Sequence, residues 1–509
     1  MGGHMELEFD IRGEATGRRS QGRPFNLLVI GNFGGHACPA PGSGGYTLET
    51  HKIIRVDLDN LDDLWSRFSP ALSFQAAQAT IEFSPADIED FHPDHLYRSQ
   101  PIFAELRKTR KKLLDPTTAQ ATLHDLLSEQ TPASEQSTAE PNQLSAKEEN
   151  EEADSMFERL LGKPGGQPTA QRSMASGDAK LDSFIRKLVA PHVVREPDPQ
   201  VNTAIDSIDF VTSQLMREFL HQPDFQTLEA SWCSLFDLVS ELELDENLQL
   251  YVCDIQKTEL LAALPDPGTA LQESSLFQLL VHRRRQATDD TPWTVVVGDF
   301  YFGPGPEDIA LLTALGAAAA VNGGVFLAGA SPDILGCKTT AELADVKYWS
   351  AGDERSTLWH SLRTSPVSGH IGLALPRLLL RLPYGENTEE IDTFYFEEMP
   401  QRSHEHYLWA NPSWSCARLL AQTFTQEGWR MEPGDHVDLG NLPAHHYKED
   451  GESRLQPCAE LLLSESTMVA MLEQGLMPLV SYRNQNTVVL GRFQSIADPL
   501  KPLAGPWVN

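Results

Sequence analysis

The chain has 509 residues, enough for two or three domains with sizeable cores. Its apolar fraction of 40% and charged fraction of 22% are those of a soluble globular protein. The net charge of −32 argues against nucleic acid or an anionic membrane surface as the main partner.

Cysteine usage and the start of the chain both favour a cytoplasmic location. The six cysteines are widely scattered and form no C-x-x-C pair, which is typical of reduced core residues. Residues 1–5 lack the apolar segment of a signal peptide, and we expect Met5, rather than Met1, to be the natural start.

The first 130 residues predict alternating strands and helices. An apolar run at 24–31, followed by glycines, is typical of a buried strand. Asn60, with acidic residues directly after it, is expected to be the N-cap of a helix. Further strands are expected at 53–57 and 79–83, and further helices over 101–114 and 118–130.

Residues 131–178 differ in composition from the rest of the chain. Gln, Ser, Glu, Pro and Ala dominate them, and aromatic residues are nearly absent. Such a segment buries too little apolar surface to offset its ordering entropy, so we expect a disordered acidic linker. Its apolar island, from Met156 to Leu161, is either residual hydrophobicity or a partner-binding peptide.

A second region is expected over residues 179–509. Apolar residues recur with helical spacing from 205 to 220, and a second helix is expected after Pro223 through Trp232. Strands are expected at 248–253, 370–376, 477–480 and 488–490, and a helix at 275–281.

Residues 291–336 fix the fold class. A β-branched run at 294–302 predicts a buried strand, Pro306 suits the first turn of a helix, and Asn322 with the glycines after it ends that helix. A second apolar run at 325–330 returns to the sheet. This β-α-β crossover requires parallel strands. We therefore expect an α/β protein with mixed sheets.

Two other interpretations of this stretch are weaker. Residues 310–330 carry no charge, but their Ala and Gly content and the break at 322–324 argue against a membrane span. Gly303 and Gly305 suggest a phosphate loop, yet no Gly-Lys-Ser/Thr follows and two prolines remove N–H donors. We expect a turn without a ligand.

Candidate metal sites are few. His404 and His406 flank Glu405, and His445 and His446 lie in an expected turn, but a third zinc ligand with supporting spacing is missing. Another polar cluster, which precedes an expected helix, consists of Asp90, His92, Asp94 and His95. Such a cluster can bind a metal ion, but Asp94 is equally well interpreted as the N-cap of that helix.

Catalytic constellations are also missing from the sequence. Arg377 and Arg381, expected four apart on one helix face, can clamp a carboxylate, but pairing with the chain's own acids is favoured. Glu397 and Glu398 form a common acidic pair with little information. We predict no catalytic, cofactor-binding or metal-binding residue, and no enzymatic activity.

Residues 179–500 resemble TssC (VipB, ImpC), the large sheath subunit of the bacterial type VI secretion system. Residues 5–130 resemble its small partner TssB (VipA, ImpB) at 24–31, 59–63 and 90–94. The TssC-like motifs occur in the order of that family. They lie at 221–232, 298–303, 306–312, 330–332, 359–363, 372–385, 407–411 and 475–480.

The resemblance implies a fusion of two sheath modules, 5–130 and 179–509, joined by the 131–178 linker, with a contractile-sheath-like core. Relative to that family, the second region ends early after Gln494 and lacks interlocking strands, and the arm that binds the recycling ATPase ClpV has no clear counterpart. We therefore expect a protomer that does not polymerise by strand addition.

The function implied is a non-enzymatic structural component that caps, nucleates or docks on a sheath or baseplate. Its expected partners are other secretion components: sheath subunits, baseplate, tube or assembly factors. One alternative is a polymerising sheath subunit. Another, of a different class, is a small-molecule-binding α/β enzyme, since fold does not fix function.

Overall fold

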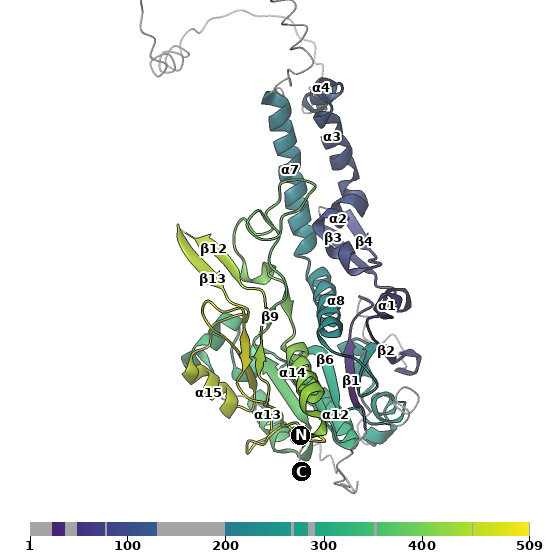
Figure 1. Cartoon of the computed structure of the whole chain (residues 1–509), viewed down its shortest axis with the longest axis vertical. Helices are drawn as coiled ribbons and strands as arrows, with labels where there is room; N and C mark the ends of the chain where they lie inside the picture. The colour runs from purple at the N-terminus through teal and green to yellow at the C-terminus, as the bar shows by residue number, and fades with distance from the viewer. Residues whose placement is uncertain are drawn as a thin grey trace, which may run out of the picture. The chain divides into compact units, whose positions relative to one another are not determined.

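The computed structural model describes residues 23–35, 48–76, 79–129, 199–265, 269–283, 291–350, 354–449 and 451–507. The expected linker at 131–178, with its apolar island at 156–161, lies outside these ranges. The chain divides into two compact units, one of residues 1–104 with 209–509 and one of residues 105–208. Figure 1 shows the chain and labels many of its helices and strands.

The larger unit is built on a nine-stranded mixed sheet in the order β11-β15-β14-β8-β7-β6-β1-β5-β2. The six strands from β14 to β5 run parallel to one another, whereas β2 is antiparallel to β5, β15 to β14 and β11 to β15. The strands are β1 (Phe25–Gly31), β2 (Ile54–Val56), β5 (Leu248–Asp254), β6 (Val295–Phe302), β7 (Val325–Ala330), β8 (Ile371–Leu375), β11 (Asp438–Leu439), β14 (Met477–Ser481) and β15 (Val488–Leu490).

Strand β1 lies in the interior of this sheet, although it comes from the first sequence region. Val29 is opposite Val252 of β5 on one side and Val297 of β6 on the other. All seven residues of β1 are buried, as expected for a strand with neighbours on both edges and helices over its faces. The two sequence regions therefore share one sheet.

The predicted crossover is confirmed as β6, helix α12 (Pro306–Asn322) and β7. Gly323 ends α12 in the left-handed conformation, with φ of 67°. The helix end interrupts the uncharged run, and among the described residues no helix has both the length and the apolar character that a membrane span requires.

Helices cover both faces of the sheet. Leu28, Tyr251, Val296 and Phe326 share one buried cluster with α12. Because side chains alternate along a strand, their neighbours point to the opposite face. There α14 (Pro412–Glu427), which is outside that cluster, contacts β6, β7 and β8.

Further elements surround this core. The remaining helices of the unit are α1 (Leu61–Phe68), α2 (Pro93–Ser99), α8 (Pro223–Glu241), α9 (Lys257–Ala262), α10 (Ser275–Phe277), which continues as a π-helix at Gln278–His282, α13 (Glu354–Thr364) and α15 (Glu465–Glu473). Three antiparallel pairs complete it: β3 (Leu72–Ala76) with β4 (Ala79–Phe83), β9 (Leu378–Leu379) with β10 (Trp409–Ala410), and β12 (His445–Glu449) with β13 (Glu452–Gln456).

The N-cap prediction for α1 was only partly correct. Asn60 does occupy the N-cap position, but its side chain makes no capping bond to the helix. Instead its amide oxygen accepts from the backbone N–H of Asp57, and its amide nitrogen donates to the carbonyl of Arg55. The residue stabilises the turn before the helix.

The smaller unit consists of helices. It contains α3 (Ala104–Leu114) from Glu105 onward, α4 (Ala119–Glu129), and the first half of α7 (Pro199–Leu220) up to Ile208. Its cluster of buried apolar residues is Leu113, Ala119, Leu123, Val201 and Ile208. The helices predicted over 101–114 and 118–130 are confirmed, the first after a 3-10 turn at Pro101–Phe103.

Candidate functional site

The first functional feature is the aromatic contact between the two sequence regions of the larger unit. Trp65 of α1 stacks on Trp232 of α8, with ring centroids 3.6 Å apart and an interplanar angle of 12°. Phe33, directly after β1, meets the Trp232 ring edge-on, and its carbonyl accepts the indole N–H at 3.0 Å. These contacts fix α1 and the end of β1 onto α8.

A second contact is polar and uses Asp94 of α2. Its carboxylate accepts hydrogen bonds from the backbone N–H groups of Asp392 and Thr393, at 3.0 and 3.1 Å, and from the Thr393 hydroxyl. Burial alone would raise the pKa of Asp94, but these hydrogen bonds lower it below its ordinary value. The ionised carboxylate thus holds the 392–393 segment on α2.

The N-cap prediction for Asp94 is therefore wrong. The N-cap of α2 is His92, whose ring accepts from the Asp94 N–H, and Asp94 lies inside the first turn. Its carboxylate is committed to the second sequence region. Asp90 closes a capping box with Asp87 at the preceding 3-10 helix. Asp90, His92 and Asp94 of this cluster are thus each bonded to other groups of the protein.

A buried ion-pair network lies beside this contact. Arg381 is held between two carboxylates, Glu229 of α8 at 2.7 Å and Glu398 at 2.8 Å. The side chains of both glutamates are 1% exposed. His221, directly after α7, and His406 lie next to Glu398. We call the five residues Arg381, Glu229, Glu398, His221 and His406 the Arg381 cluster.

The electrostatics of the Arg381 cluster are those of a structural ion pair. Burial alone would raise the pKa of Glu398, but the charge of Arg381 and the contacts from His221, Arg381 and the Tyr384 N–H lower it to about 2. Burial raises the pKa of Glu229 despite Arg381. Removing one member of such a network leaves an uncompensated buried charge.

Arg377 forms a second pair, with Glu460. The carboxylate of Glu460 also accepts from the backbone N–H of Arg377 and lies 2.7 Å from His404 Nε2. The expectation that Arg377 and Arg381 share a helix face is wrong, because β9 lies between them and the segment is extended. The expected pairing of both arginines with the chain's own acids is confirmed.

The four candidate zinc histidines do not converge. His404 binds Glu460, and His406 belongs to the Arg381 cluster. His445 lies in β12 rather than in a turn, and its Nδ1 is 2.8 Å from the Tyr407 hydroxyl, while His446 is exposed. Within the described ranges, no group of three or more His, Cys, Asp or Glu side chains is arranged to hold a metal ion.

The Gly303–Gly305 turn is closed by the chain itself. The backbone N–H of Gly303 donates to the Asp308 carboxylate at 2.7 Å, and Lys257 Nζ lies 2.6 Å from the other oxygen of that group. A protein carboxylate thus occupies the position at the start of α12 where a phosphate loop would bind its anion. The geometry agrees with the predicted turn.

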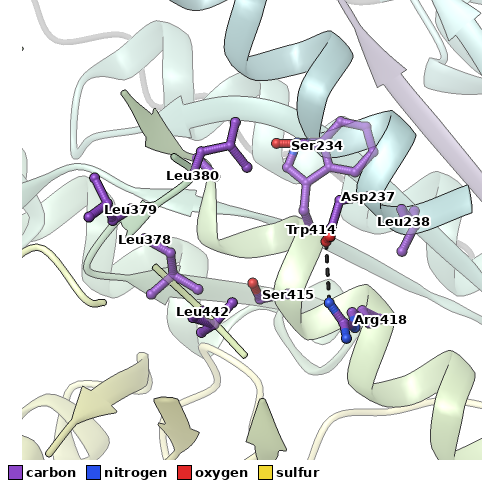
Figure 2. A pocket seen from close by; sticks show the side chains of 11 residues that line it. Ser234, Asp237, Leu238, Leu378, Leu379, Leu380, Trp414, Ser415, Arg418 and Leu442 are labelled. Carbon is purple, nitrogen blue, oxygen red and sulfur yellow. Dashed lines mark hydrogen bonds and ion pairs between the residues drawn. The ribbon is translucent and has the colours of Figure 1, made fainter. Parts of the chain in front are cut away.

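A small pocket lies between α8, β9 and α14 (Figure 2). Leu378, Leu379 and Leu380 line one side of it, and Ser234 and Arg418 contribute polar groups. Arg418 pairs with Asp237 and with Glu241, at 3.2 and 2.6 Å. The interior space of about 40 Å³ has room for a few water molecules only.

Sequence reasoning missed the most connected residues. Glu229 and Glu398, which neutralise Arg381, are 152 and 17 residues away from it in the chain. Asp299 is another example: it is buried in β6, accepts from the Ser231 hydroxyl at 2.6 Å, and has a pKa raised by burial. The signal for Glu398 was its pairing with Glu397, which is too common to single it out.

Both sequence regions match known protein families. Residues 202–497 match the VipB family, described as the EvpB tail sheath N-terminal domain, and residues 6–145 match the family described as type VI secretion system, VipA. The chain is 30% identical over 338 residues to the type VI secretion system sheath protein TssC1 of Pseudomonas aeruginosa. That alignment covers 63% of this chain and 67% of the relative.

Proposed function

Since the chain belongs to the type VI secretion sheath family and joins a VipA-like region to a VipB-like region, we propose that it is a sheath-like fusion protomer. In this role it caps, nucleates or docks on a sheath or baseplate. Its structural role in type VI secretion follows from the family; the docking role is our proposal.

The observation that carries the proposal is the position of β1. This strand of the VipA-like region lies between β5 and β6 of the VipB-like region. The sheet of the second region is therefore not continuous without the first. A covalent tether brings the two regions together at an effective concentration of roughly millimolar. The fusion favours one protomer per chain.

The edges of the sheet support docking over propagation. The outer strands are β2, with three residues, and β11, with two residues. Short edge strands are poor templates for pairing with another chain. A unit with such edges contacts its neighbours through side-chain surfaces, as a cap or an adaptor does.

A polymerising sheath subunit is the second candidate. It is favoured by the relative, which is named a sheath protein. Both candidates are non-enzymatic, and the clustered ionisable groups suit this role because they are bonded to one another. The partners in either case are other type VI components: sheath subunits, baseplate, tube or assembly factors.

Electron microscopy of the purified chain tests the choice. A cap or adaptor is expected to remain as discrete particles at every concentration, whereas long helical tubes would establish the polymerising subunit instead. A pull-down with the other secretion components, with and without residues 131–178, then identifies the neighbour. A ligand or metal retained in native mass spectrometry would favour a small-molecule-binding protein.

A further inference from the structure

Two histidine rings stack inside the larger unit. His221 directly follows α7, and His406 is the last residue of the 3-10 helix His404–His406. Their ring centroids are 3.9 Å apart and their planes differ by 9°. Gln226 of α8 donates to the carbonyls of Glu405 and His406, so the stack forms part of the joint between the α7–α8 turn and the 3-10 helix.

Charged groups face this stack from several elements. His221 Nε2 lies 3.4 Å from Glu398, whose carboxylate is also bonded to Arg381. Glu229 of α8 reaches Arg381 from the opposite side. Tyr384 lies over the guanidinium, Cys233 lies near Glu229, and Glu405 adjoins His406 on its own helix. One cation thus stands between two carboxylates.

The stacking geometry limits how many protons the two rings can hold. Arg381 lies between Glu398, whose pKa is lowered to about 2, and Glu229, whose pKa is raised by burial. Protonation of both rings would place two cations face to face at 3.9 Å in a partly buried site, where like charges repel.

We propose that the His221–His406 stack is a proton-sensitive joint. It stays closed while at most one ring is protonated, and binding of the second proton separates the 3-10 helix from the end of α7. Acidification then loosens the segment between Glu398 and β10, which adjoins the loop that Asp94 binds.

The electrostatic environment of His406 gives the direction of the effect. Burial, followed by the charge of His221, lowers the pKa of His406 below its ordinary value of 6.5. The closed joint therefore favours the neutral ring. The stabilisation provided by the closed joint is present above pH 6.5 and is lost as the pH falls below that value, because the opened state then binds the proton more readily. Glu398 remains ionised in this range because its pKa is about 2.

Hydrogen exchange measured by mass spectrometry on the full chain tests the joint. We compare protection factors at pH 7.5 and pH 5.5 for peptides covering 219–226 and 398–409. Uptake of one extra proton on opening changes the opening equilibrium by up to tenfold per pH unit. We therefore expect protection in the wild-type peptides to fall by about tenfold at pH 5.5.

The variant His406→Phe distinguishes the pH effect of the joint from that of other titrating groups. Phenylalanine keeps a stacking ring but binds no proton, so its peptides are expected to lose less than twofold of their protection. His51 and His445, which titrate elsewhere, are present in both proteins. His446→Gln, at an exposed position, serves as the control and is expected to behave as wild type.

Equal losses of protection in the wild type and in His406→Phe would overturn the proposal, as would unchanged protection in the wild type. If His406→Phe does not fold, His221→Phe provides the same comparison from the other ring. Wild-type-like loss in that variant would likewise overturn the proposal.

Discussion

Trp65 and Trp232 stack in near-parallel contact, 3.6 Å between centroids, although one belongs to the VipA-like region and the other to the VipB-like region. Both are almost fully buried, at 6% and 1% exposed. The stack is an intramolecular core contact, and its loss is measurable as a change in stability.

Trp65→Ala is expected to destabilise the larger unit by about 3–5 kcal/mol, because it removes a large buried ring and leaves a cavity against Trp232. Urea unfolding followed by circular dichroism measures the change. Tyr348→Ala is the control: this ring is 53% exposed, and its loss is expected to change stability by about 0.5 kcal/mol or less. Similar effects of the two variants would contradict the importance of the stack.

Cutting the chain between its two regions should not separate them. A site-specific protease sequence inserted within residues 131–178 allows cleavage after folding. Because β1 is bonded to strands on both sides, the two fragments are expected to co-elute in size-exclusion chromatography. They should separate only in denaturant. Elution as two independent fragments in native buffer would be incompatible with the shared sheet.

Arg381→Met is expected to cost about 3–5 kcal/mol, because it leaves Glu229 and Glu398 buried without a cation. Arg418→Met is a matched control. Arg418 also bridges two carboxylates, Asp237 and Glu241, but their side chains are 53% and 46% exposed. Loss of such solvated pairs is expected to cost about 1 kcal/mol or less. Chemical denaturation measures the loss of stability in both variants. Equal losses would show that the burial of the carboxylates does not determine the cost of removing the arginine.

Stability at acidic pH should depend on Glu460. Burial alone would raise its pKa, but bonds from His404 and Arg377 lower it from 4.5 to about 2. The stabilisation is therefore present above pH 4.5 and is lost as the pH falls toward 2. We expect Glu460→Gln to be less stable by roughly 3 kcal/mol at neutral pH.

The difference between wild type and Glu460→Gln should shrink between pH 4.5 and pH 2, as measured by urea unfolding at each pH. Glu405→Gln provides the control, since Glu405 lies 3.9 Å from the same arginine with 75% of its side chain exposed. That variant should show no such trend. A constant difference for Glu460→Gln across the range would mean that its carboxylate is not selectively stabilised.

Gly324 allows the crossover to be tested. A Cβ atom at this position would lie 2.4 Å from the carbonyl oxygen of Trp293 and 2.5 Å from that of Thr294. Because backbone must move to make room, Gly324→Ala is expected to lower stability by about 1–3 kcal/mol. Gly440→Ala, with open space around it, should stay within about 0.5 kcal/mol. Thermal unfolding compares the two, and equal melting temperatures would argue against this close approach.

The elements that could be predicted are those with strong local signals. The strands β1, β5, β6, β7 and β8 are mainly apolar and mostly buried, because both faces of a parallel sheet are covered. The two-residue strands β9 and β10 are too short to show a period. Helix α14 was missed, although Asn411 with Pro412 forms an N-terminal signature that could have located it.

The site was less predictable than the fold. The spacing of Arg377 and Arg381 suggested a helix, but Pro376 and Pro383 restrict the backbone around them and favour an extended segment. Their partners come from distant parts of the chain. Spacing along the chain carries no information on contacts such as Arg381 with Glu229, which depend on how the sheet brings the segments together.

The central position of β1 has a consequence for biosynthesis. Its last strand neighbour, β6, ends about 270 residues after β1 in the chain, so a ribosome adding roughly 5–20 residues per second needs tens of seconds to supply it. Until β5 is made, the apolar segment Phe25–Gly31 has neither of its strand partners, and until β6 is made it lacks one of them. If the two regions were translated from separate mRNAs, their strands would have to find one another by diffusion. A single message delivers them from the same ribosome in a fixed ratio, and exposure of the unpaired strand ends when translation reaches β6.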